Sequence, residues 1–265
     1  MYSRSQLTKK YIQYYLTASN GKGHGIHSPF VFDFIKNVLR DKKKYDCYTI
    51  IEKGRQQLLN QRATIDVTDF GAGSGLNKTN KRRVADMAKS SLKPKKYASL
   101  LFRIVRHYQP QTMLELGTSF GITTSYLAAG NTNGKVYTIE GSPAIAGIAT
   151  KTFICTGFKN IELTTGNFKD HLPAVLAKLN SIDLAFIDGN HRKQPTLDYF
   201  TQLVNCSTPS TILIFDDIHW SSEMEDAWLT IKNHPSVTLT IDFFFIGIVF
   251  FNTGIKIPQH FIIRF

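Results

Sequence analysis

One segment near the middle of the chain, residues 112–124, constrains the fold more than any other. It begins with a short apolar run, Met113 to Leu116, that breaks at Gly117. A second glycine, Gly121, precedes a stretch with the character of a helix N-terminus. This order predicts a strand, a glycine loop and the start of a helix, a geometry in which backbone N–H groups approach an anionic ligand closely.

A second strand-like run ends in an acid at a matching distance. Glu140 closes the run 135–139 and lies 23 residues after Gly117. At the tip of the second strand of a strand–helix–strand unit, an acid can accept hydrogen bonds from both hydroxyls of a ribose. The glycine loop alone is a weak signal, but together with Glu140 it indicates a site for a nucleoside cofactor.

From Lys96 onward, apolar strand-like runs alternate with segments of helical periodicity. Such a pattern is typical of a parallel sheet covered by helices on both faces. The end of the chain differs, because 237–251 and 260–265 are predicted as two strands with no helix between them. We therefore expect an α/β fold: a doubly wound, mostly parallel seven-stranded sheet, closed by an antiparallel hairpin of these two C-terminal strands. Residues 96–265 would form this Rossmann-like domain, and residues 1–95 a basic, mainly helical cap or lid.

Another glycine-rich segment, Asp69–Gly75, matches a phosphate-binding loop better by its glycines alone. The stretch that follows it, 76–84, is polar and basic and has no apolar helical face, and no strand ending in an acid follows about 20 residues later. We therefore expect a surface loop, with a flap over cofactor or substrate as the alternative. The loop containing His24 and His27 is likewise expected to be ordinary, with a lid as the alternative.

The positive charge is concentrated in the first part of the chain. Residues 1–110 hold 22 Lys and Arg against 7 Asp and Glu, a net charge of +15, whereas residues 111–265 hold 10 against 13, a net charge of −3. The field of a basic layer attracts an acidic or phosphorylated substrate, or nucleic acid. A solvated surface that aids solubility is the alternative.

Cysteine usage and hydropathy favour the cytoplasm. The three cysteines, Cys47, Cys155 and Cys206, are too far apart for a disulfide framework or a CxxC metal cluster. The N-terminus carries no apolar signal core, and the apolar run 243–251 is far shorter than the roughly 20 residues of a membrane helix. We expect no membrane partner.

Four motifs follow one another along residues 95–265: Glu115–Gly121, Glu140, Asp188–His191 and Asp216–Asp217. In this order and spacing they resemble class I S-adenosylmethionine-dependent methyltransferases, and most closely the branch with catechol and caffeoyl-CoA O-methyltransferases. The resemblance implies transfer of a methyl group from S-adenosylmethionine to an oxygen of a small or medium acceptor.

The resemblance also implies roles for individual residues. Glu115 would pair with the amino group of the cofactor's methionine part, and the loop backbone with the Thr123 hydroxyl would hold its carboxylate. Glu140 would bind the ribose, and Asn167 with Phe168 the adenine. The cofactor-binding set implied in this way is Glu115, Gly117, Thr118, Ser119, Gly121, Thr123, Glu140, Asn167, Phe168 and Asp188.

Three carboxylates are predicted at neighbouring strand ends, Asp188 after one strand and Asp216 and Asp217 after the next. Carboxylates that converge repel one another unless a cation lies among them, and oxygen ligands suit Mg²⁺, Ca²⁺ or Mn²⁺ rather than zinc. The resembled branch holds a divalent cation here, although Asp217 stands where the branch has an amide. Acids that serve the cofactor or cap a helix, without a metal, are the alternative.

His191 stands where the metal-dependent branch carries a lysine taken as the general base. Histidine titrates near neutral pH, so His191, with Asp188 as the second catalytic residue, is the hypothesised acceptor of the substrate hydroxyl proton. A simply solvated histidine is the alternative.

Two other function classes stay open. A nucleic-acid-binding protein or RNA methyltransferase would use the basic first part of the chain. An NAD(P)-dependent oxidoreductase is less favoured, because Gly117 and Gly121 lack the G-x-G-x-x-G spacing. The partner expected first is a small-molecule acceptor that is acidic or phosphorylated. A homodimer is compatible with the sequence. The identity of the acceptor and the oligomeric state do not follow from the sequence.

Overall fold

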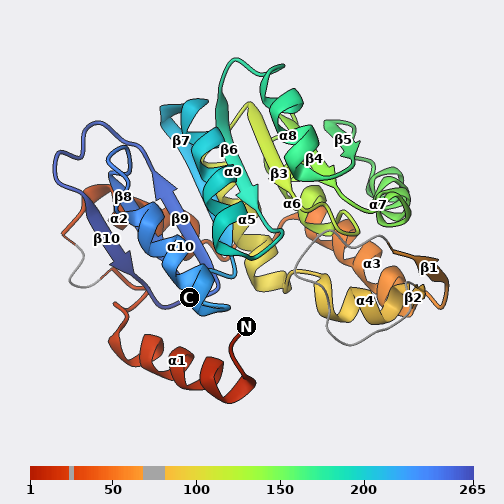
Figure 1. The fold of residues 1–265 in the computed structure, drawn as a ribbon, viewed down its shortest axis with the longest axis horizontal. Coiled ribbons are helices and arrows are strands. Elements are labelled where there is room, and N and C mark those ends of the chain that lie inside the picture. The colour runs from red at the N-terminus through yellow and green to blue at the C-terminus, as the bar shows by residue number, and fades with distance from the viewer. Residues whose placement is uncertain (24–26, 68–80) are drawn as a thin grey trace. The chain divides into compact units, whose positions relative to one another are not determined.

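The computed structural model describes residues 1–23, 27–67 and 81–265 of the chain. The segment Asp69–Gly75 and His24, for which the sequence left alternatives open, lie outside the described residues. The fold is α/β, with a mostly parallel eight-stranded sheet in the order β10-β8-β9-β7-β6-β3-β4-β5 (Figure 1). The chain divides into two compact units, here called the central unit (residues 42–179) and the terminal unit (residues 1–41 and 180–265).

The central unit contains three strands of the large sheet, a small two-stranded sheet and the helices between them. The strands β3, β4 and β5 pair in parallel, and β1 pairs with β2 in antiparallel register. In chain order the elements are α3 (Asp46–Asn60), β1 (Thr64–Asp66), β2 (Lys81–Arg83), α4 (Val84–Ser91), α5 (Lys95–Tyr108), β3 (Thr112–Leu116), α6 (Ile122–Gly130), β4 (Lys135–Glu140), α7 (Pro143–Thr156), β5 (Ile161–Thr165) and α8 (Phe168–Leu176).

The terminal unit joins the first helices of the chain to its last strands. In Figure 1, α9 and α10 lie in front of its strands and α2 lies behind them. Its elements are α1 (Arg4–Thr17), α2 (Pro29–Phe34), the π-helical turn η1 (Ile35–Leu39), β6 (Ile182–Ile187), α9 (Lys193–Asn205), β7 (Ser207–Asp216), α10 (Ser222–Lys232), β8 (Leu239–Asp242), β9 (Ile246–Phe250) and β10 (Gln259–Ile262).

The C-terminal hairpin differs from the expectation. The run 237–251 was predicted as one strand, but it contains both β8 and β9, which pair with each other in antiparallel register. The chain reverses at Phe244, which adopts a φ of 72° while its N–H donates to Asp242 Oδ1 at 2.8 Å. Because an apolar residue occupies this turn, no glycine or proline marks it in the sequence. The last strand, β10, pairs in parallel with β8, so the sheet has eight strands rather than seven.

The expected N-terminal helices are confirmed, and the structure shows what they pack against. In α1, Tyr11 and Tyr14 pack on Phe244, with ring centroids 5.2 and 5.4 Å away. The Tyr14 hydroxyl donates to the backbone carbonyl of Ile263. These contacts of α1 thus run to the turn between β8 and β9 and to the segment after β10, within the terminal unit.

Residues 42–95 contribute to a different core. Ile51 of α3 and Val84 and Ala88 of α4 belong to the same buried cluster as Phe120 and Tyr126, next to and within α6. The Tyr126 hydroxyl donates to Glu52 Oε1 at 2.9 Å, and burial, followed by the charge of Glu52, raises its pKa. The expected division of the chain at residue 95 stays a prediction.

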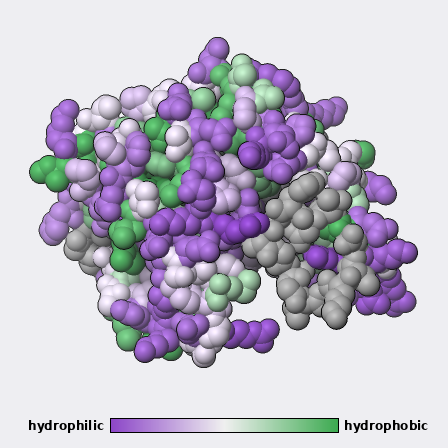
Figure 2. All heavy atoms as spheres, viewed as in Figure 1, coloured by the Kyte–Doolittle hydropathy of each residue, from purple (hydrophilic) through white to green (hydrophobic). Residues whose placement is uncertain are grey.

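Two surface observations bear on partners. Across the described residues, no helix is both long enough and apolar enough to cross a bilayer. On the face drawn in Figure 2, hydrophilic residues predominate and the hydrophobic ones form separate small areas.

Candidate functional site

The glycine loop after β3 is a tight backbone structure. Gly117, Ser119 and Gly121 all have positive φ, at 102°, 49° and 80°. Gly121 is the N-cap of α6, and a Cβ placed on it would lie 2.5 Å from the ring of Phe153. Only glycine fits this position well. Because glycine has no side chain, no capping oxygen occupies the first N–H groups of α6, where Thr123 is the second residue.

The N–H groups at the start of the loop already have protein partners. Those of Gly117 and Thr118 both donate to the backbone carbonyl of Ile139, at 3.0 and 3.3 Å. They therefore tie the loop to β4 in this structure. The predicted hold on a cofactor carboxylate by these two groups stays a prediction.

Glu115 lies behind the loop and is fully buried. Its Oε2 accepts hydrogen bonds from the Thr124 hydroxyl of α6 at 2.5 Å and the Thr138 hydroxyl of β4 at 2.6 Å. The Thr118 hydroxyl lies 2.6 Å from that of Thr138. Glu115 thus connects two strands, a helix and the loop. The Glu115 carboxylate is not exposed to solvent. Its pairing with the cofactor's amino group stays a prediction.

Glu140 lies at the strand end where the sequence predicted it. Its Oε2 accepts from the Ser119 N–H at 2.8 Å and its Oε1 from the Ser142 N–H at 2.9 Å. The Ser119 hydroxyl lies 3.3 Å from that of Ser91, at the end of α4. An acid at the tip of β4 is therefore fixed directly beside the glycine loop.

The two residues predicted at the adenine begin α8. Asn167 is its N-cap and accepts from the Lys169 N–H at 3.0 Å, and Phe168 is its first residue. Both side chains are half-buried. The amide of Asn167 therefore has a local structural role, and the ring of Phe168 is in part accessible.

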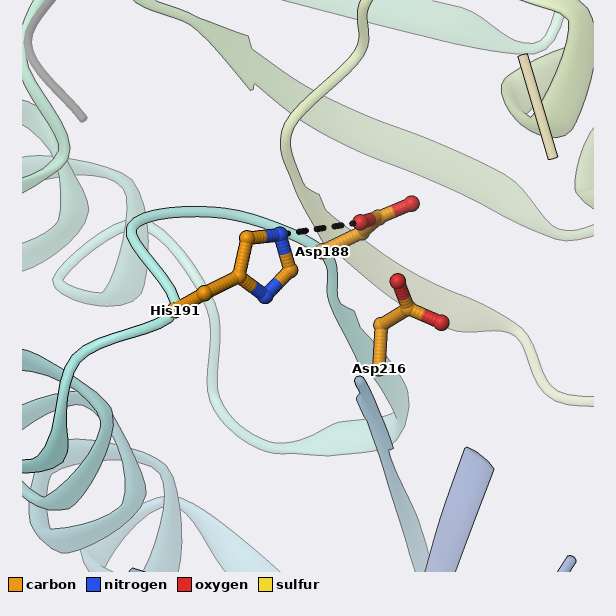
Figure 3. Close-up of side chains that lie close together, drawn as sticks. All are labelled: Asp188, His191 and Asp216. Atoms are coloured by element: carbon orange, nitrogen blue, oxygen red, sulfur yellow. Dashed lines mark ion pairs between the residues drawn. The ribbon is translucent and has the colours of Figure 1, made fainter. Parts of the chain in front are cut away.

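In the terminal unit, three predicted residues come together. One ligand atom each from Asp188, His191 and Asp216 lies within 4.8 Å of the others (Figure 3). His191 Nε2 is 3.6 Å from Asp188 Oδ1, and these two side chains are 25% and 19% exposed, whereas Asp216 is buried. This set is called the Asp–His–Asp group below.

The loops that hold this group are unusual in backbone conformation. Asn190 and His191 both have positive φ, at 70° and 36°, and the Asn190 amide donates to the Tyr199 hydroxyl at 3.2 Å. Asp217 also has positive φ, at 53°, and its N–H donates to the Phe245 carbonyl at 2.6 Å. Among the described residues, Asp217 is not a member of the group that includes Asp216.

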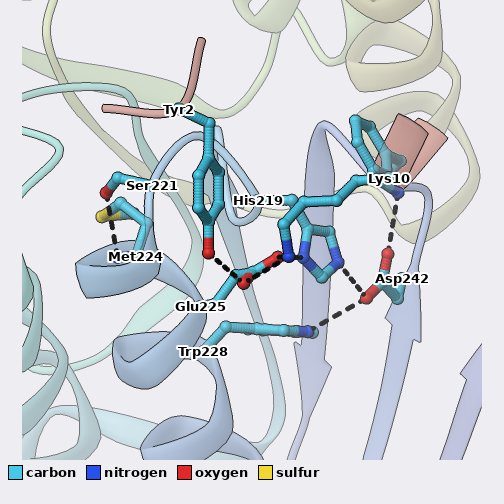
Figure 4. Close-up of polar contacts among 9 residues, drawn as sticks. Tyr2, Lys10, His219, Ser221, Met224, Glu225, Trp228 and Asp242 are labelled. Carbon is cyan, nitrogen blue, oxygen red and sulfur yellow. Dashed lines mark hydrogen bonds and ion pairs between the residues drawn. The ribbon is translucent and has the colours of Figure 1, made fainter. Parts of the chain in front are cut away.

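A second polar network in the terminal unit was not predicted from the sequence (Figure 4). His219 lies between two carboxylates, with Nδ1 3.0 Å from Glu225 Oε1 and Nε2 2.9 Å from Asp242 Oδ2. The Tyr2 hydroxyl and the Lys10 ammonium also donate to Glu225, at 2.7 and 3.0 Å. The network therefore ties the start of the chain to α10.

The network shifts the titration of its members. Burial alone would lower the pKa of His219, but the Asp242 carboxylate and then Glu225 outweigh it and raise that pKa above its ordinary value. Burial opposes ionisation of Glu225 as well, yet hydrogen bonds from Tyr2, Lys10 and His219 hold its pKa below the ordinary value. Sequence signals for this network are absent because its members lie at positions as far apart as 2 and 242.

Comparison with known proteins supports the resemblance seen in the sequence. Residues 114–218 match a family described as a methyltransferase domain. A curated relative, O-methyltransferase imqG of Aspergillus flavus, is 32% identical over 111 residues, which cover 40% of this chain and 44% of the relative. The match thus spans less than half the length of that relative.

Solved structures share the fold. An O-methyltransferase from Bacillus cereus in complex with SAH (S-adenosylhomocysteine) is 22% identical, with a TM-score of 0.56 over 83% of this chain and 97% of that one. The SAH-bound methyltransferase PaMTH1 of Podospora anserina is 12% identical, with a TM-score of 0.57 over 95% and 97%. The resemblance to class I S-adenosylmethionine-dependent methyltransferases is confirmed.

Proposed function

We propose that this protein is an S-adenosylmethionine-dependent O-methyltransferase that acts on a hydroxyl group of a small or medium acceptor. The observation that carries the proposal is the position of the glycine loop. It falls within the segment that matches a methyltransferase domain, and it begins α6 with a glycine N-cap beside Glu140.

We assign residues of the central unit to the cofactor. The first N–H groups of α6 suit the carboxylate of S-adenosylmethionine, because helix N-termini favour anions. Glu140, held by two backbone N–H groups, is placed to accept hydrogen bonds from ribose hydroxyls. Phe168 offers a ring for the adenine. Glu115 contributes from behind the loop by fixing Thr124 and Thr138.

The terminal unit supplies polar groups for the acceptor. Methyl transfer forms a bond between the acceptor oxygen and the methyl carbon and breaks the bond from that carbon to sulfur, whose electron pair stays on the product SAH. The hydroxyl proton must leave, and alignment of the two reactants provides much of the rate. Asp188 and His191 are the residues that we assign to the acceptor, either through proton transfer or by holding a divalent cation that lowers the acceptor's pKa.

The donor set of the Asp–His–Asp group fits such a cation. Two ligands on opposite sides of an ion at bond lengths of about 2.0–2.3 Å are at most roughly 4.6 Å apart, close to the 4.8 Å span of the three side chains. The oxygens of Asp188 and Asp216 and one nitrogen of His191 would hold the ion.

Acidic or phosphorylated acceptors, a homodimer and a cytoplasmic location remain part of the proposal, on the strength of the sequence alone. The comparisons support neither the nucleic-acid-binding nor the oxidoreductase alternative.

Turnover tests the proposal. The protein is incubated with S-adenosylmethionine and a panel of catechols, hydroxybenzoates and phosphorylated alcohols, and SAH is measured by mass spectrometry. We expect SAH only in the presence of a suitable acceptor.

Glu140→Gln should raise the KM for S-adenosylmethionine about tenfold, since hydrogen bonds to a charged group contribute roughly 1.5–3 kcal/mol. Glu162→Gln, at an exposed ion pair of β5 with Lys135, is the control and should leave KM unchanged. Failure to form SAH with any acceptor, together with failure to bind S-adenosylmethionine, would refute the proposal.

A further inference from the structure

The Asp–His–Asp group differs in chemistry from the ligand set expected from the sequence. Three carboxylates were predicted, and an oxygen-only set favours Mg²⁺ or Ca²⁺. In the structure the third member is the imidazole of His191, whereas Asp217 is not part of the group. The donors that the described residues bring together are therefore two carboxylates and one nitrogen.

The separation of His191 and Asp188 suits two ligands of one ion. At 3.6 Å, Nε2 and Oδ1 are too far apart for a hydrogen bond. Neighbouring ligands of an ion at bond lengths of about 2.1 Å lie roughly 3–3.5 Å apart. The two atoms thus need to move only slightly to share an ion.

The backbone around the group holds these donors in place. His191 follows Asn190 in a pair of residues with positive φ, and the Asn190 amide is bonded to Tyr199 of α9. Non-glycine residues adopt this conformation at a cost in free energy, so surrounding contacts must maintain it. The other carboxylate, Asp216, ends a buried strand and is itself buried.

We infer that Asp188, His191 and Asp216 form a mixed nitrogen–oxygen site that selects divalent transition ions, of the class of Mn²⁺, Co²⁺ and Zn²⁺, over Mg²⁺ and Ca²⁺. Imidazole is a good ligand for the transition ions and a poor one for the hard alkaline-earth ions. His191 then serves as a ligand, and the acceptor proton leaves to solvent. The role of the site beside an acceptor rests on the proposed function, but ion binding does not.

Metal titration of the whole protein tests the inference. Protein freed of metal with EDTA is titrated by calorimetry with Mg²⁺, Mn²⁺, Co²⁺ and Zn²⁺, and the Mn²⁺ complex is examined by pulsed electron paramagnetic resonance for coupling to an imidazole nitrogen. We expect affinities in the order Mg²⁺ < Mn²⁺ < Co²⁺, with Zn²⁺ also tighter than Mg²⁺ by about tenfold or more. His191→Ala should abolish the nitrogen coupling and weaken Mn²⁺ and Co²⁺ binding by about tenfold or more.

The matched control is Asp217→Asn, which changes an adjacent acid outside the group and should retain both the affinities and the coupling. Melting temperatures of each variant verify that it folds. Equal or tighter binding of Mg²⁺, an intact nitrogen coupling in His191→Ala, or no ion binding by the wild type would each overturn the inference. Loss of pH-dependent turnover in His191→Ala with unchanged ion binding would assign His191 as the general base instead.

SAH binding, measured on the same metal-free protein, separates this inference from the proposed function. Ion binding without SAH binding would leave the ion site standing and refute the methyltransferase. SAH binding without ion binding would do the reverse.

Discussion

The glycine loop of the central unit and the Asp–His–Asp group of the terminal unit are built in different ways. In the loop, the fixed elements are backbone conformations and buried hydrogen bonds, such as those from Thr124 and Thr138 to Glu115. In the group, the functional atoms belong to side chains, two of them partly exposed. The glycine loop therefore depends on the fold of the backbone, whereas the Asp–His–Asp group depends on a few side chains.

The largest effect on ligand binding should come from a substitution in the glycine loop. Gly121→Ala places a Cβ 2.5 Å from the Phe153 ring in a residue with a φ of 80°. We expect SAH affinity, measured by calorimetry, to fall about 100-fold, since each hydrogen bond lost between the first N–H groups of α6 and the ligand's carboxylate costs roughly 1.5–3 kcal/mol. Stability should fall by about 1–3 kcal/mol.

The control for this change is Gly147→Ala, in the exposed part of α7. An added Cβ meets nothing within 4 Å there, so the variant should bind SAH normally and gain about 0.5–1 kcal/mol in stability. Normal SAH binding by Gly121→Ala would show that the loop is not the cofactor site.

A smaller effect should follow from a substitution in the Asp–His–Asp group. Asp216→Asn keeps the shape of a buried side chain but removes its charge, and we expect turnover to fall about tenfold, because the cation would lose one of its charged ligands. SAH affinity should not change, because Asp216 is not among the residues expected to contact the cofactor. Asp217→Asn is the matched control and should retain most of its turnover. A loss of SAH affinity in Asp216→Asn as large as that in Gly121→Ala would contradict the assignment of cofactor binding to the glycine loop and of the acceptor to the Asp–His–Asp group.

The smallest functional effect is expected at His219. Its hydrogen bonds run to Glu225 and Asp242, and not to the glycine loop or the Asp–His–Asp group. His219→Gln should lower stability in urea denaturation by roughly 1.5–3 kcal/mol at about pH 6, with SAH affinity unchanged. Because the pKa of His219 is raised, its contribution is fully present below the ordinary value of 6.5 and is lost as the pH rises through the raised value.

The gap between wild type and His219→Gln should therefore narrow at high pH. Lys89→Gln, at the exposed pair with Asp86, serves as the control and should change stability by about 0.5 kcal/mol or less at any pH. A gap that widens as the pH rises would contradict the assignment of a charged His219 between Glu225 and Asp242.

The same comparison explains what could be predicted from the sequence. From β3 to α10, strands and helices follow local periodicity, and Gly117, Gly121 and Glu140 are readable because their spacing along the chain reflects the loop directly. The hydrogen bonds of Glu115 could not be predicted from the spacing of residues, because its partners Thr124 and Thr138 lie on other elements.

Other features depend on contacts distant in sequence. The reversal at Phe244 has no turn residue, so the run 237–251 is predicted as one strand. The strand β2 and the helix α4 were not predicted, because they lie within and next to the polar and basic stretch 76–84. Asp217 has a positive φ, which no pattern of residue types indicates, and it is not part of the group that includes Asp216.

We propose that the loop from Gly117 to Gly121 binds S-adenosylmethionine and its product independently of the Asp–His–Asp group. The decisive measurement is calorimetric titration of the wild type and Asp216→Asn with SAH, with NADH as a control ligand. We expect micromolar binding of SAH by both proteins and no heat with NADH. Absence of SAH binding by the wild type, or equal binding of NADH, would contradict it.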